Sequence, residues 1–297
     1  MPDLTLFSPA KINLFLAVVG RRDDGFHDLV SLVSPVAFGD EINFDLIPEE
    51  SIKLFCDDPV LPTDETNLVV RAAQLFREET GWRQGVQFNL VKRIPHGAGL
   101  GGGSSNASTV LMGLNQLSGL NLSRDTLLGW AARLGSDCPF FLLRCAAVMR
   151  GRGEVLEPVT ESVATRLKGQ RVWLYKPDVG VSTPWAYGRL ASDPAGCYLP
   201  RSEAEARLQA WASGQNSVST LAFNSFEKVV FQKFIALPTL AKMVAAQTGY
   251  TVHMSGSGST CFTLLPEEKE PERETRLRKI IREAWGEEAF FVETVLS

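Results

Sequence analysis

Residues 95–107 read Pro95-His96-Gly97-Ala98-Gly99-Leu100-Gly101-Gly102-Gly103-Ser104-Ser105-Asn106-Ala107, so that five glycines stand directly before a helical pattern. That pattern consists of apolar residues at the spacing of one helix face, namely Ala107, Val110, Leu111, Leu114 and Leu117. Glycines leave backbone N–H groups bare, and the first turn of a helix carries partial positive charge. The stretch therefore predicts a phosphate-binding loop, whose natural ligand is a nucleoside triphosphate.

Three other interpretations of this loop are weaker. Gly97, Gly99 and Gly102 match the dinucleotide pattern G-x-G-x-x-G, but the acidic residue expected at the end of the next strand is missing. The loop has no Gly-Lys-Ser/Thr, because Ser104 follows Gly103, so a Walker motif is excluded. A flexible linker is disfavoured because the loop lies between a strand and a well-patterned helix.

The flanking sequence alternates helices and strands. A helix is predicted over residues 67–79, with Gly81 as its stop, and another over residues 123–134, with Ser123 as its cap. Strands are predicted over residues 86–91 and over residues 10–18, where Lys11 and Asn13 share one face. The glycine loop is thus the turn of a strand-loop-helix unit.

The composition of the sequence changes after Pro158, and there we place the boundary between two domains, 1–158 and 159–297. The second part has a Gly/Ser/Pro-rich loop over 177–184 and a polar stretch over 192–219 that we leave unassigned. A mixed α/β unit closes the chain, with helices over 239–248 and 271–285 and strands over 252–265 and 290–296.

Composition excludes several classes of protein. The 30 basic and 34 acidic residues give a net charge of −4 without a basic stripe, which argues against nucleic acid as a partner. The five cysteines and three histidines lack the spacing of a disulfide framework or a transition-metal site. No apolar run reaches 18 residues and no signal-peptide pattern is present, so we expect a cytoplasmic protein without a membrane partner.

The glycine loop resembles the central signature of the GHMP kinases, the superfamily of galactokinase, homoserine kinase, mevalonate kinase and phosphomevalonate kinase. The two other signatures of that superfamily are also present, in the same order, as Pro9-Ala10-Lys11-Ile12-Asn13-Leu14 and Met254-Ser255-Gly256-Ser257-Gly258-Ser259-Thr260. The resemblance implies an α+β fold of two domains, the first like domain 2 of ribosomal protein S5 and the second ferredoxin-like.

Within the superfamily the chain most resembles the kinases that act on a diphosphocytidyl sugar alcohol. The segments that carry this likeness are 20–27, 134–141 and 151–154, of which the second reads Leu134-Gly135-Ser136-Asp137-Cys138-Pro139-Phe140-Phe141. The implied reaction is ATP-dependent phosphorylation of the 2-hydroxyl of 4-diphosphocytidyl-2-C-methyl-D-erythritol in isoprenoid precursor synthesis.

The same resemblance implies the catalytic pair. Asp137 aligns with the family's catalytic aspartate and Lys11 with the lysine beside it. From the residues alone, Asp137 could equally be an ordinary helix cap before Pro139, and Lys11 an exposed strand lysine. ATP would bind the whole glycine loop from Pro95 to Ser105, and we add Asn67 to this nucleotide site.

Other family positions imply the substrate and metal contacts. Phe26, His27 and Tyr187 would bind the cytosine base by stacking and by hydrogen bonds to its edge, although Phe26 stands where the family usually has tyrosine and Tyr187 could be simple core. Asn13 and Thr183 would contact the acceptor sugar, and Gly256 completes the substrate site. Mg²⁺ is implied by the chemistry; its ligands are undefined, with Ser105 as a candidate contact.

Two rival functions remain open from the sequence. The chain could be a GHMP kinase for another alcohol, such as homoserine or mevalonate, or a catalytically silent metabolite sensor on the same fold. Retention of both Lys11 and Asp137 argues against the sensor. The oligomeric state is undefined by the sequence.

Overall fold

The computed structural model describes all 297 residues, which form two compact units. Unit 1 comprises residues 1–11, 38–96 and 101–144, and unit 2 comprises residues 12–37, 97–100 and 145–297. The strands β1 (Leu4–Arg21) and β2 (His27–Ile47) each begin in one unit and end in the other. The boundary predicted near Pro158 assumed that each domain is one continuous stretch of sequence. Each unit is instead made of several segments, because these two long strands pass from one unit to the other.

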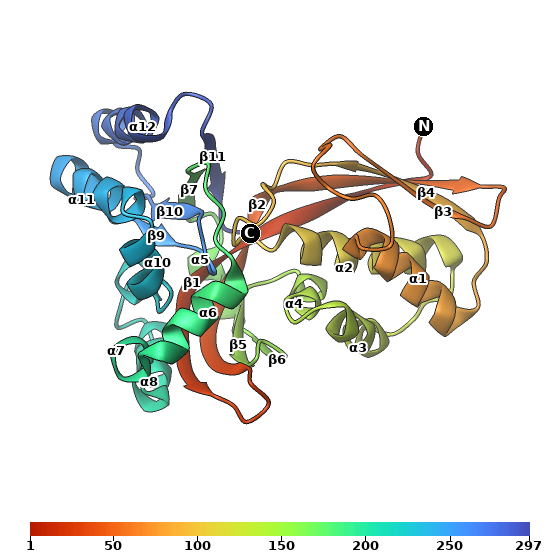
Figure 1. The fold of residues 1–297 in the computed structure, drawn as a ribbon, viewed down its shortest axis with the longest axis horizontal. Helices are drawn as coiled ribbons and strands as arrows, with labels where there is room; N and C mark the ends of the chain where they lie inside the picture. Colours follow the sequence, from red (N-terminus) through yellow and green to blue (C-terminus); the bar gives the residue numbers. More distant parts are fainter. The chain divides into compact units, whose positions relative to one another are not determined.

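Unit 1 is a sheet covered on one face by helices, as Figure 1 shows for α1 to α4. The second half of β2 pairs antiparallel with β4, and β3 pairs parallel with β4. The further elements of this unit are β3 (Ile52–Cys56), α1 (Leu68–Thr80), β4 (Gly85–Val91), α2 (Gly102–Ser118), α3 (Arg124–Leu134) and α4 (Cys138–Leu143).

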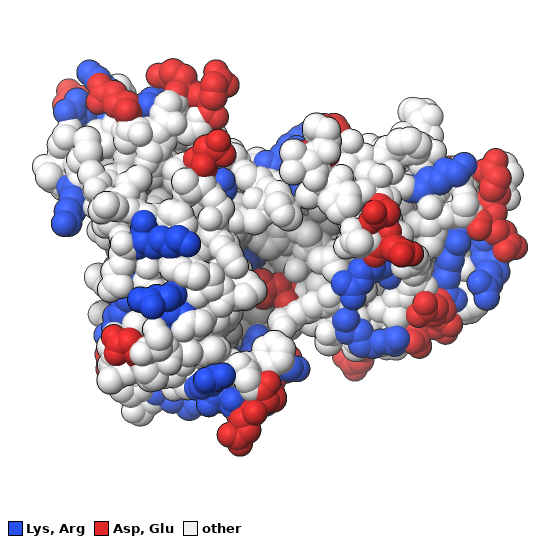
Figure 2. Space-filling view, viewed as in Figure 1, with Lys and Arg blue, Asp and Glu red and all other residues white.

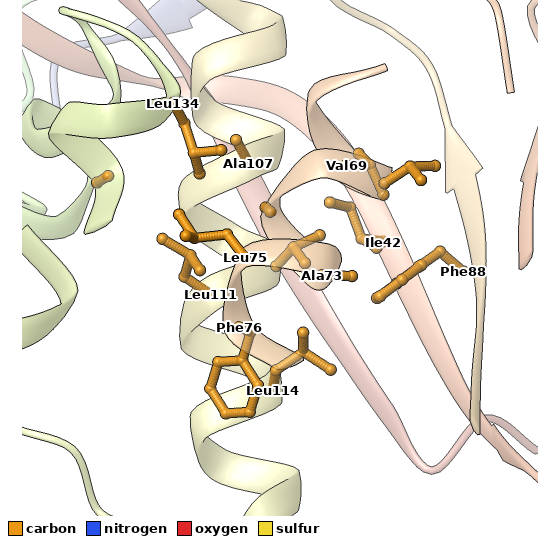
Figure 3. Close-up of a cluster of buried hydrophobic side chains, with 14 of the residues drawn as sticks. Ile42, Val69, Ala73, Leu75, Phe76, Phe88, Ala107, Leu111, Leu114 and Leu134 are labelled. Atoms are coloured by element: carbon orange, nitrogen blue, oxygen red, sulfur yellow. The ribbon is translucent and has the colours of Figure 1, made fainter. Parts of the chain in front are cut away.

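The core of unit 1 lies between this sheet and α1 and α2. In Figure 3, Leu75 and Phe76 of α1 lie beside Leu111 and Leu114 of α2, and all four side chains are buried. Gly113 lets α2 approach β2 closely, because an added Cβ there would lie 2.3 Å from the Phe44 ring. The sequence period that predicted α2 therefore reflects its contact with this core.

Local end signals place the helices of unit 1. The Asn67 side chain accepts a hydrogen bond from the backbone N–H of Val69, and Gly81 ends α1 in the left-handed region. Ser123 caps α3 in the same way, and Gly119 ends α2 with φ 67°. The predicted helices over 67–79 and 123–134 are thus confirmed to within a residue or two.

Unit 2 begins with the remaining halves of β1 and β2. The first half of β2 pairs antiparallel with β5 (Ala147–Gly151), which in turn pairs with β6 (Val155–Pro158). β8 (Phe223–Asn224) pairs parallel with β1 at Phe15 and Leu16. The alternation over residues 10–18 correctly predicted part of β1, although the strand is longer than the pattern indicated.

A second sheet in unit 2 has the order β11-β7-β10-β9. Its strands are β7 (Arg171–Lys176), β9 (His253–Met254), β10 (Cys261–Leu264) and β11 (Phe290–Val295). The helices α11 (Ala236–Thr248) and α12 (Pro271–Trp285) bury Leu240, Val244, Leu277, Ile280 and Ile281. The mixed α/β unit predicted at the end of the chain is confirmed.

The polar stretch 192–219, which the sequence left unassigned, is largely helical. It contains α7 (Pro194–Cys197), α8 (Arg201–Ala212) and the start of α9 (Val218–Leu221). Ala204, Leu208 and Trp211 of α8 are buried. The remaining helices of unit 2 are α5 (Glu161–Leu167), α6 (Thr183–Ser192) and α10 (Glu227–Lys233).

The surface in Figure 2 shows Lys and Arg side chains interspersed with Asp and Glu side chains, without a continuous basic stripe on that face. No individual helix has both the length and the hydropathy of a membrane span. The helices α10 and α11 meet these criteria only when taken together, and they are bent by 106° at their junction.

Candidate active site

Lys11 and Asp137 lie together in unit 1, although 126 positions separate them in the sequence. The Nζ atom of Lys11 is 3.8 Å from Oδ2 of Asp137. The lysine side chain is 7% exposed and the aspartate side chain 45% exposed. A buried ammonium therefore faces a carboxylate that solvent, and hence a substrate, can reach.

The position of Asp137 does not depend on a capping bond from its carboxylate. Asp137 occupies the N-cap position of α4, but its side chain makes no capping hydrogen bond. The next residue is anchored instead, because the hydroxyl of Ser108 in α2 donates to the carbonyl oxygen of Cys138 at 2.6 Å. Asp137 thus stands at a helix start, as the alternative of a helix cap expects, but its carboxylate makes no capping bond and faces Lys11 instead.

Burial perturbs the lysine of this pair. The pKa of Lys11 lies below its ordinary value because burial disfavours the ammonium, and the charge of Asp137 opposes this effect only in part. The carboxylate therefore stabilises the protonated lysine at the base of the site.

The glycine stretch is divided between the units. Residues 97–100 belong to unit 2, where Ala98 and Leu100 are buried. The hydroxyl of Ser255 donates to the carbonyl oxygen of Gly99 at 3.0 Å, and the N–H of Thr260 donates to that of Ala98 at 3.3 Å. The second and third GHMP-like signatures thus support each other directly.

Gly99 must be glycine for two reasons. Its φ of +77° is in the left-handed region, and an added Cβ would lie 2.2 Å from the carbonyl oxygen of Ser255. Glycine is therefore needed in this loop both for the positive φ and for the close packing against residues 255–258.

The start of α2 belongs to unit 1 and carries the other glycines. Gly101 is the N-cap with φ 72°, and the N–H of Ser105 bonds back to its carbonyl oxygen. The N–H groups of the first helical turn, over 102–104, lack partners within the helix. They are the donors that a phosphate group at this helix end would take.

Two residues predicted for the nucleotide site have other partners. Ser105 is fully buried and accepts a hydrogen bond from the hydroxyl of Ser8 at 2.8 Å. Its neighbour Ser104 is partly exposed, and its side chain hydrogen-bonds the side chain of Cys138. Asn67 caps α1 and also donates to the carbonyl oxygen of Pro62, which accounts for its side chain without a nucleotide.

His27 and Tyr187 are brought together in unit 2. Their rings are stacked with centroids 4.8 Å apart, and Tyr198 meets the histidine ring edge-on at 5.8 Å. Nε2 of His27 and the hydroxyl of Tyr198 are both buried without a hydrogen-bond partner. Such orphaned polar atoms are costly unless a ligand pairs them.

The pKa of His27 is lowered, first by burial and then by the charge of Arg21. A neutral imidazole has one nitrogen that donates and one that accepts. That combination suits the edge of a nucleobase, which also presents both donors and acceptors.

Phe26 lies apart from this stack, with an exposed ring under the guanidinium of Arg152, 4.7 Å from its centroid. The cation covers one face of the phenyl group. The predicted role of Phe26 in base stacking stays a prediction.

The predicted sugar contacts lie around the third signature. Asn13 donates its side-chain amide to Ser31, and its backbone N–H donates to Ser255. Thr183 and Ser257 share a hydrogen bond of 2.7 Å between their hydroxyls. Gly256 has φ +58°, and its carbonyl oxygen accepts from the side-chain amide of Asn224 at 2.8 Å.

Sequence reasoning missed Tyr198 and Asn224. Tyr198 lies in the stretch 192–219, where no pattern marked it, and only its contact with His27 reveals it. Asn224 bonds the carbonyl oxygens of both Met254 and Gly256 and so fixes the third signature. A lone asparagine in a sequence carries no signal for such a role.

No group of three or more His, Cys, Asp or Glu side chains is arranged to hold a metal ion. Any divalent ion at this site would take most of its ligands from phosphate oxygens and water, as Mg²⁺ does at many nucleotide sites. Ser104, a partly exposed residue of the first turn of α2, is compatible with that arrangement.

Known proteins place the chain among kinases. The family described as the GHMP kinases N terminal domain matches residues 67–144. The 4-diphosphocytidyl-2-C-methyl-D-erythritol kinase of Protochlamydia amoebophila is 39% identical over 267 residues, covering 89% of this chain and 85% of that protein. The chloroplastic enzyme of the same name from Mentha piperita is 41% identical over 86% of this chain and 62% of its own length.

Solved structures agree with these relatives. A crystal structure of a 4-(cytidine 5'-diphospho)-2C-methyl-D-erythritol kinase is 34% identical and matches with a TM-score of 0.76, covering 99% of this chain and all of that one. The mevalonate kinase of Methanococcus jannaschii shares the fold, with a TM-score of 0.74 at 13% identity over 99% of this chain and 98% of its own. The predicted α+β GHMP kinase fold is confirmed. The chain belongs to the 4-diphosphocytidyl-2-C-methyl-D-erythritol kinase family of GHMP kinases, the ATP-dependent small-molecule kinases.

Proposed function

We propose that this kinase transfers the γ-phosphoryl group of ATP to the 2-hydroxyl of 4-diphosphocytidyl-2-C-methyl-D-erythritol, with Asp137 and Lys11 as its catalytic residues. The carrying observation is the pair itself, in which the ammonium lies 3.8 Å from a half-exposed carboxylate that caps nothing. Relatives about 40% identical over most of the chain bear the name of this activity.

In the proposed reaction the oxygen of the 2-hydroxyl bonds to the γ-phosphorus as the bond between that phosphorus and the β-γ bridging oxygen breaks. Asp137 orients the hydroxyl and accepts its proton late, since a loose transition state places little demand on prior deprotonation. Lys11 offsets the charge of the carboxylate. The N–H groups of residues 102–104 hold phosphate oxygens at the positive end of α2.

Mg²⁺ belongs to this proposal as the ion that offsets the charge of the nucleotide phosphates. Ser104, which is partly exposed at the start of α2, is proposed to contact the ion or its water ligands. The buried Ser105, predicted as a contact, would have to become accessible first.

The cytidine end of the substrate is assigned to the residues around His27. Its neutral ring and the hydroxyl of Tyr198 supply two unpaired polar atoms for a base edge, and Tyr187 supplies an aromatic face beside them. Phe26 and Arg152 offer a second aromatic and cationic surface in the same unit. Asn13, Thr183 and Gly256 are proposed to contact the methylerythritol portion.

The direct test incubates the purified protein with Mg-ATP and one alcohol in each reaction. The alcohols are the diphosphocytidyl alcohol, mevalonate, homoserine and galactose. We expect ADP release and a phosphorylated product only with the first. Turnover of mevalonate or homoserine alone would disprove the substrate assignment, and binding of the cytidine compound without any turnover would favour the sensor. The cytoplasmic location and the absence of nucleic-acid and membrane partners stay predictions.

A further inference from the structure

A buried chain of polar side chains runs through unit 1 beside the start of α2. It begins at Asp40 of β2, whose carboxylate is completely buried. The N–H groups of Arg93 and Ile94 donate to its Oδ1 at 2.7 and 2.8 Å, and Nζ of Lys92 donates to its Oδ2 at 2.7 Å. The charge is therefore fully compensated, as a buried carboxylate requires.

The chain continues from Asp40 to the first turn of α2. The side-chain amide of Asn106 donates to Oδ2 of Asp40 at 2.9 Å and to the hydroxyl of Ser8 at 2.9 Å. The hydroxyl of Ser8 donates in turn to that of Ser105 at 2.8 Å. Because an amide nitrogen only donates, Ser8 must accept from Asn106 and direct its single hydrogen to Ser105.

Two members of this chain of side chains, Ser8 and Ser105, lie on segments that carry the proposed chemistry. Ser8 lies on β1, the strand that also presents Lys11, and Ser105 lies in the helical turn that offers its N–H groups to phosphate. Lys92 joins a third segment, because its Nζ also donates to the carbonyl oxygen of Ile94, just before the glycine stretch. An added Cβ on Gly102 would lie 3.1 Å from the same nitrogen.

We propose that Asp40, Asn106, Ser8 and Ser105 form a positioning relay that fixes the first turn of α2 against β1 for binding of nucleotide phosphate. The inference rests on the proposed nucleotide site. Buried polar groups stabilise a fold little more than well-packed apolar residues do, whereas hydrogen bonds of defined direction fix a single geometry. Helix N–H groups used for phosphate need that fixed geometry.

The test is a double-mutant cycle on Ser8→Ala and Ser105→Ala, read as the affinity for Mg-ADP by titration calorimetry in the absence of any alcohol substrate. Each single variant should weaken binding by about 2- to 10-fold, the range of one net hydrogen bond. The double variant should bind no more weakly than the poorer single variant, because both changes break the same link. Ser8→Thr, which keeps the hydroxyl, should restore most of the affinity.

Thr109→Val is the matched control. Thr109 is buried on the same helix, and its hydroxyl has no hydrogen-bond partner. Thr109→Val should leave the Mg-ADP affinity unchanged. Combined with Ser8→Ala, it should give the same affinity as Ser8→Ala alone. The relay is disproved if the single variants bind Mg-ADP as the wild type does, or if the losses from Ser8 and Ser105 multiply in the double variant. Failure to phosphorylate the diphosphocytidyl alcohol would contradict the proposed substrate but leave this cycle intact.

Discussion

The hydroxyl of Ser108 donates a hydrogen bond of 2.6 Å to the carbonyl oxygen of Cys138. This bond joins the buried face of α2 to the residue directly after Asp137, so the helix that begins at the glycine loop also sets the position of the proposed catalytic carboxylate. The carboxylate itself makes no capping bond to α4 and faces Lys11.

Asp137→Asn should therefore abolish most turnover without unfolding the protein. Loss of a positioned proton acceptor typically costs about 10²- to 10⁴-fold in rate, while the side chain makes no capping bond to lose. Steady-state kcat and the thermal midpoint would be measured together. A variant with wild-type kcat would show that Asp137 is not catalytic.

Lys11→Met should lower kcat by about 10²-fold or more, since it removes a charge-stabilising group, yet it should not lower the thermal midpoint at neutral pH. Because the pKa of Lys11 is lowered by burial, the folded protein binds fewer protons there than the unfolded chain does. The free energy of unfolding of the wild type should thus rise as pH approaches 10.5. Lys11→Met should lack this contribution to the pH dependence of stability. If Lys11→Met were much less stable than the wild type at neutral pH, burial of the ammonium could not be costly, and this interpretation would be wrong.

Tyr198→Phe should raise the KM for the diphosphocytidyl alcohol by about 5- to 30-fold with little change in the KM for ATP. The buried hydroxyl has no partner in the protein, and a hydrogen bond lost from a ligand costs about 1 to 2 kcal/mol. Tyr250→Phe is the control, because that hydroxyl bonds Glu270 and should affect stability alone. Equal KM values for Tyr198→Phe and wild type would remove Tyr198 from the base site.

Gly99→Ala should destabilise the protein by more than about 1 kcal/mol, because alanine at positive φ is strained and its Cβ would meet the Ser255 carbonyl oxygen at 2.2 Å. Gly129→Ala is the counterpart within α3, where an added Cβ meets nothing within 4 Å. That change should stabilise by about 0.5 to 1 kcal/mol. Chemical denaturation would give both values, and a neutral result at Gly99 would argue against the close approach.

Glu227→Gln should change how stability depends on pH. Burial raises the pKa of Glu227 from 4.5 to about 7, although its carboxylate accepts a bond from the N–H of Met254. The folded protein thus holds a proton that the unfolded chain releases, and the wild type should lose stability relative to the variant as pH rises from about 4.5 through 7. The difference should reach at most about 3 kcal/mol. Parallel curves for the two proteins would exclude this titration.

Much of the fold could be predicted where a single chain segment carries the whole signal. The residues over 271–285 show helical spacing and end at Gly286, and α12 has these bounds. The predicted cap at Ser123 is equally local, since its side chain accepts a hydrogen bond from the backbone N–H of Thr126, three residues on. Such features depend on the neighbouring sequence alone.

The lengths of β1 and β2 could not be predicted in this way. β2, for example, pairs with β5 from Leu29 to Val33 and with β4 from Glu41 to Ile47, and both partners come from distant segments of the chain. The helix α8 was missed because its exposed face is strongly charged and only Ala204, Leu208 and Trp211 are buried.

The candidate site was predictable in its parts. The approach of Lys11 to Asp137 came from resemblance and is present in the structure. Ser105 is buried against Ser8, which lies 97 positions earlier in the chain and donates a hydrogen bond to it. No local sequence pattern could predict such a pairing. Hydrogen-bond direction and burial are properties of the folded packing.

The two long strands that pass from one unit to the other have a consequence for biosynthesis. Every residue of unit 1 precedes Cys145, so that unit can close once the first half of the chain has left the ribosome. Its own strands, however, extend into segments whose partners β5 and β8 have not yet been made. A nascent chain stalled near its midpoint should therefore expose unpaired strand edges, and a gene divided at that point should yield a fragment that needs chaperones.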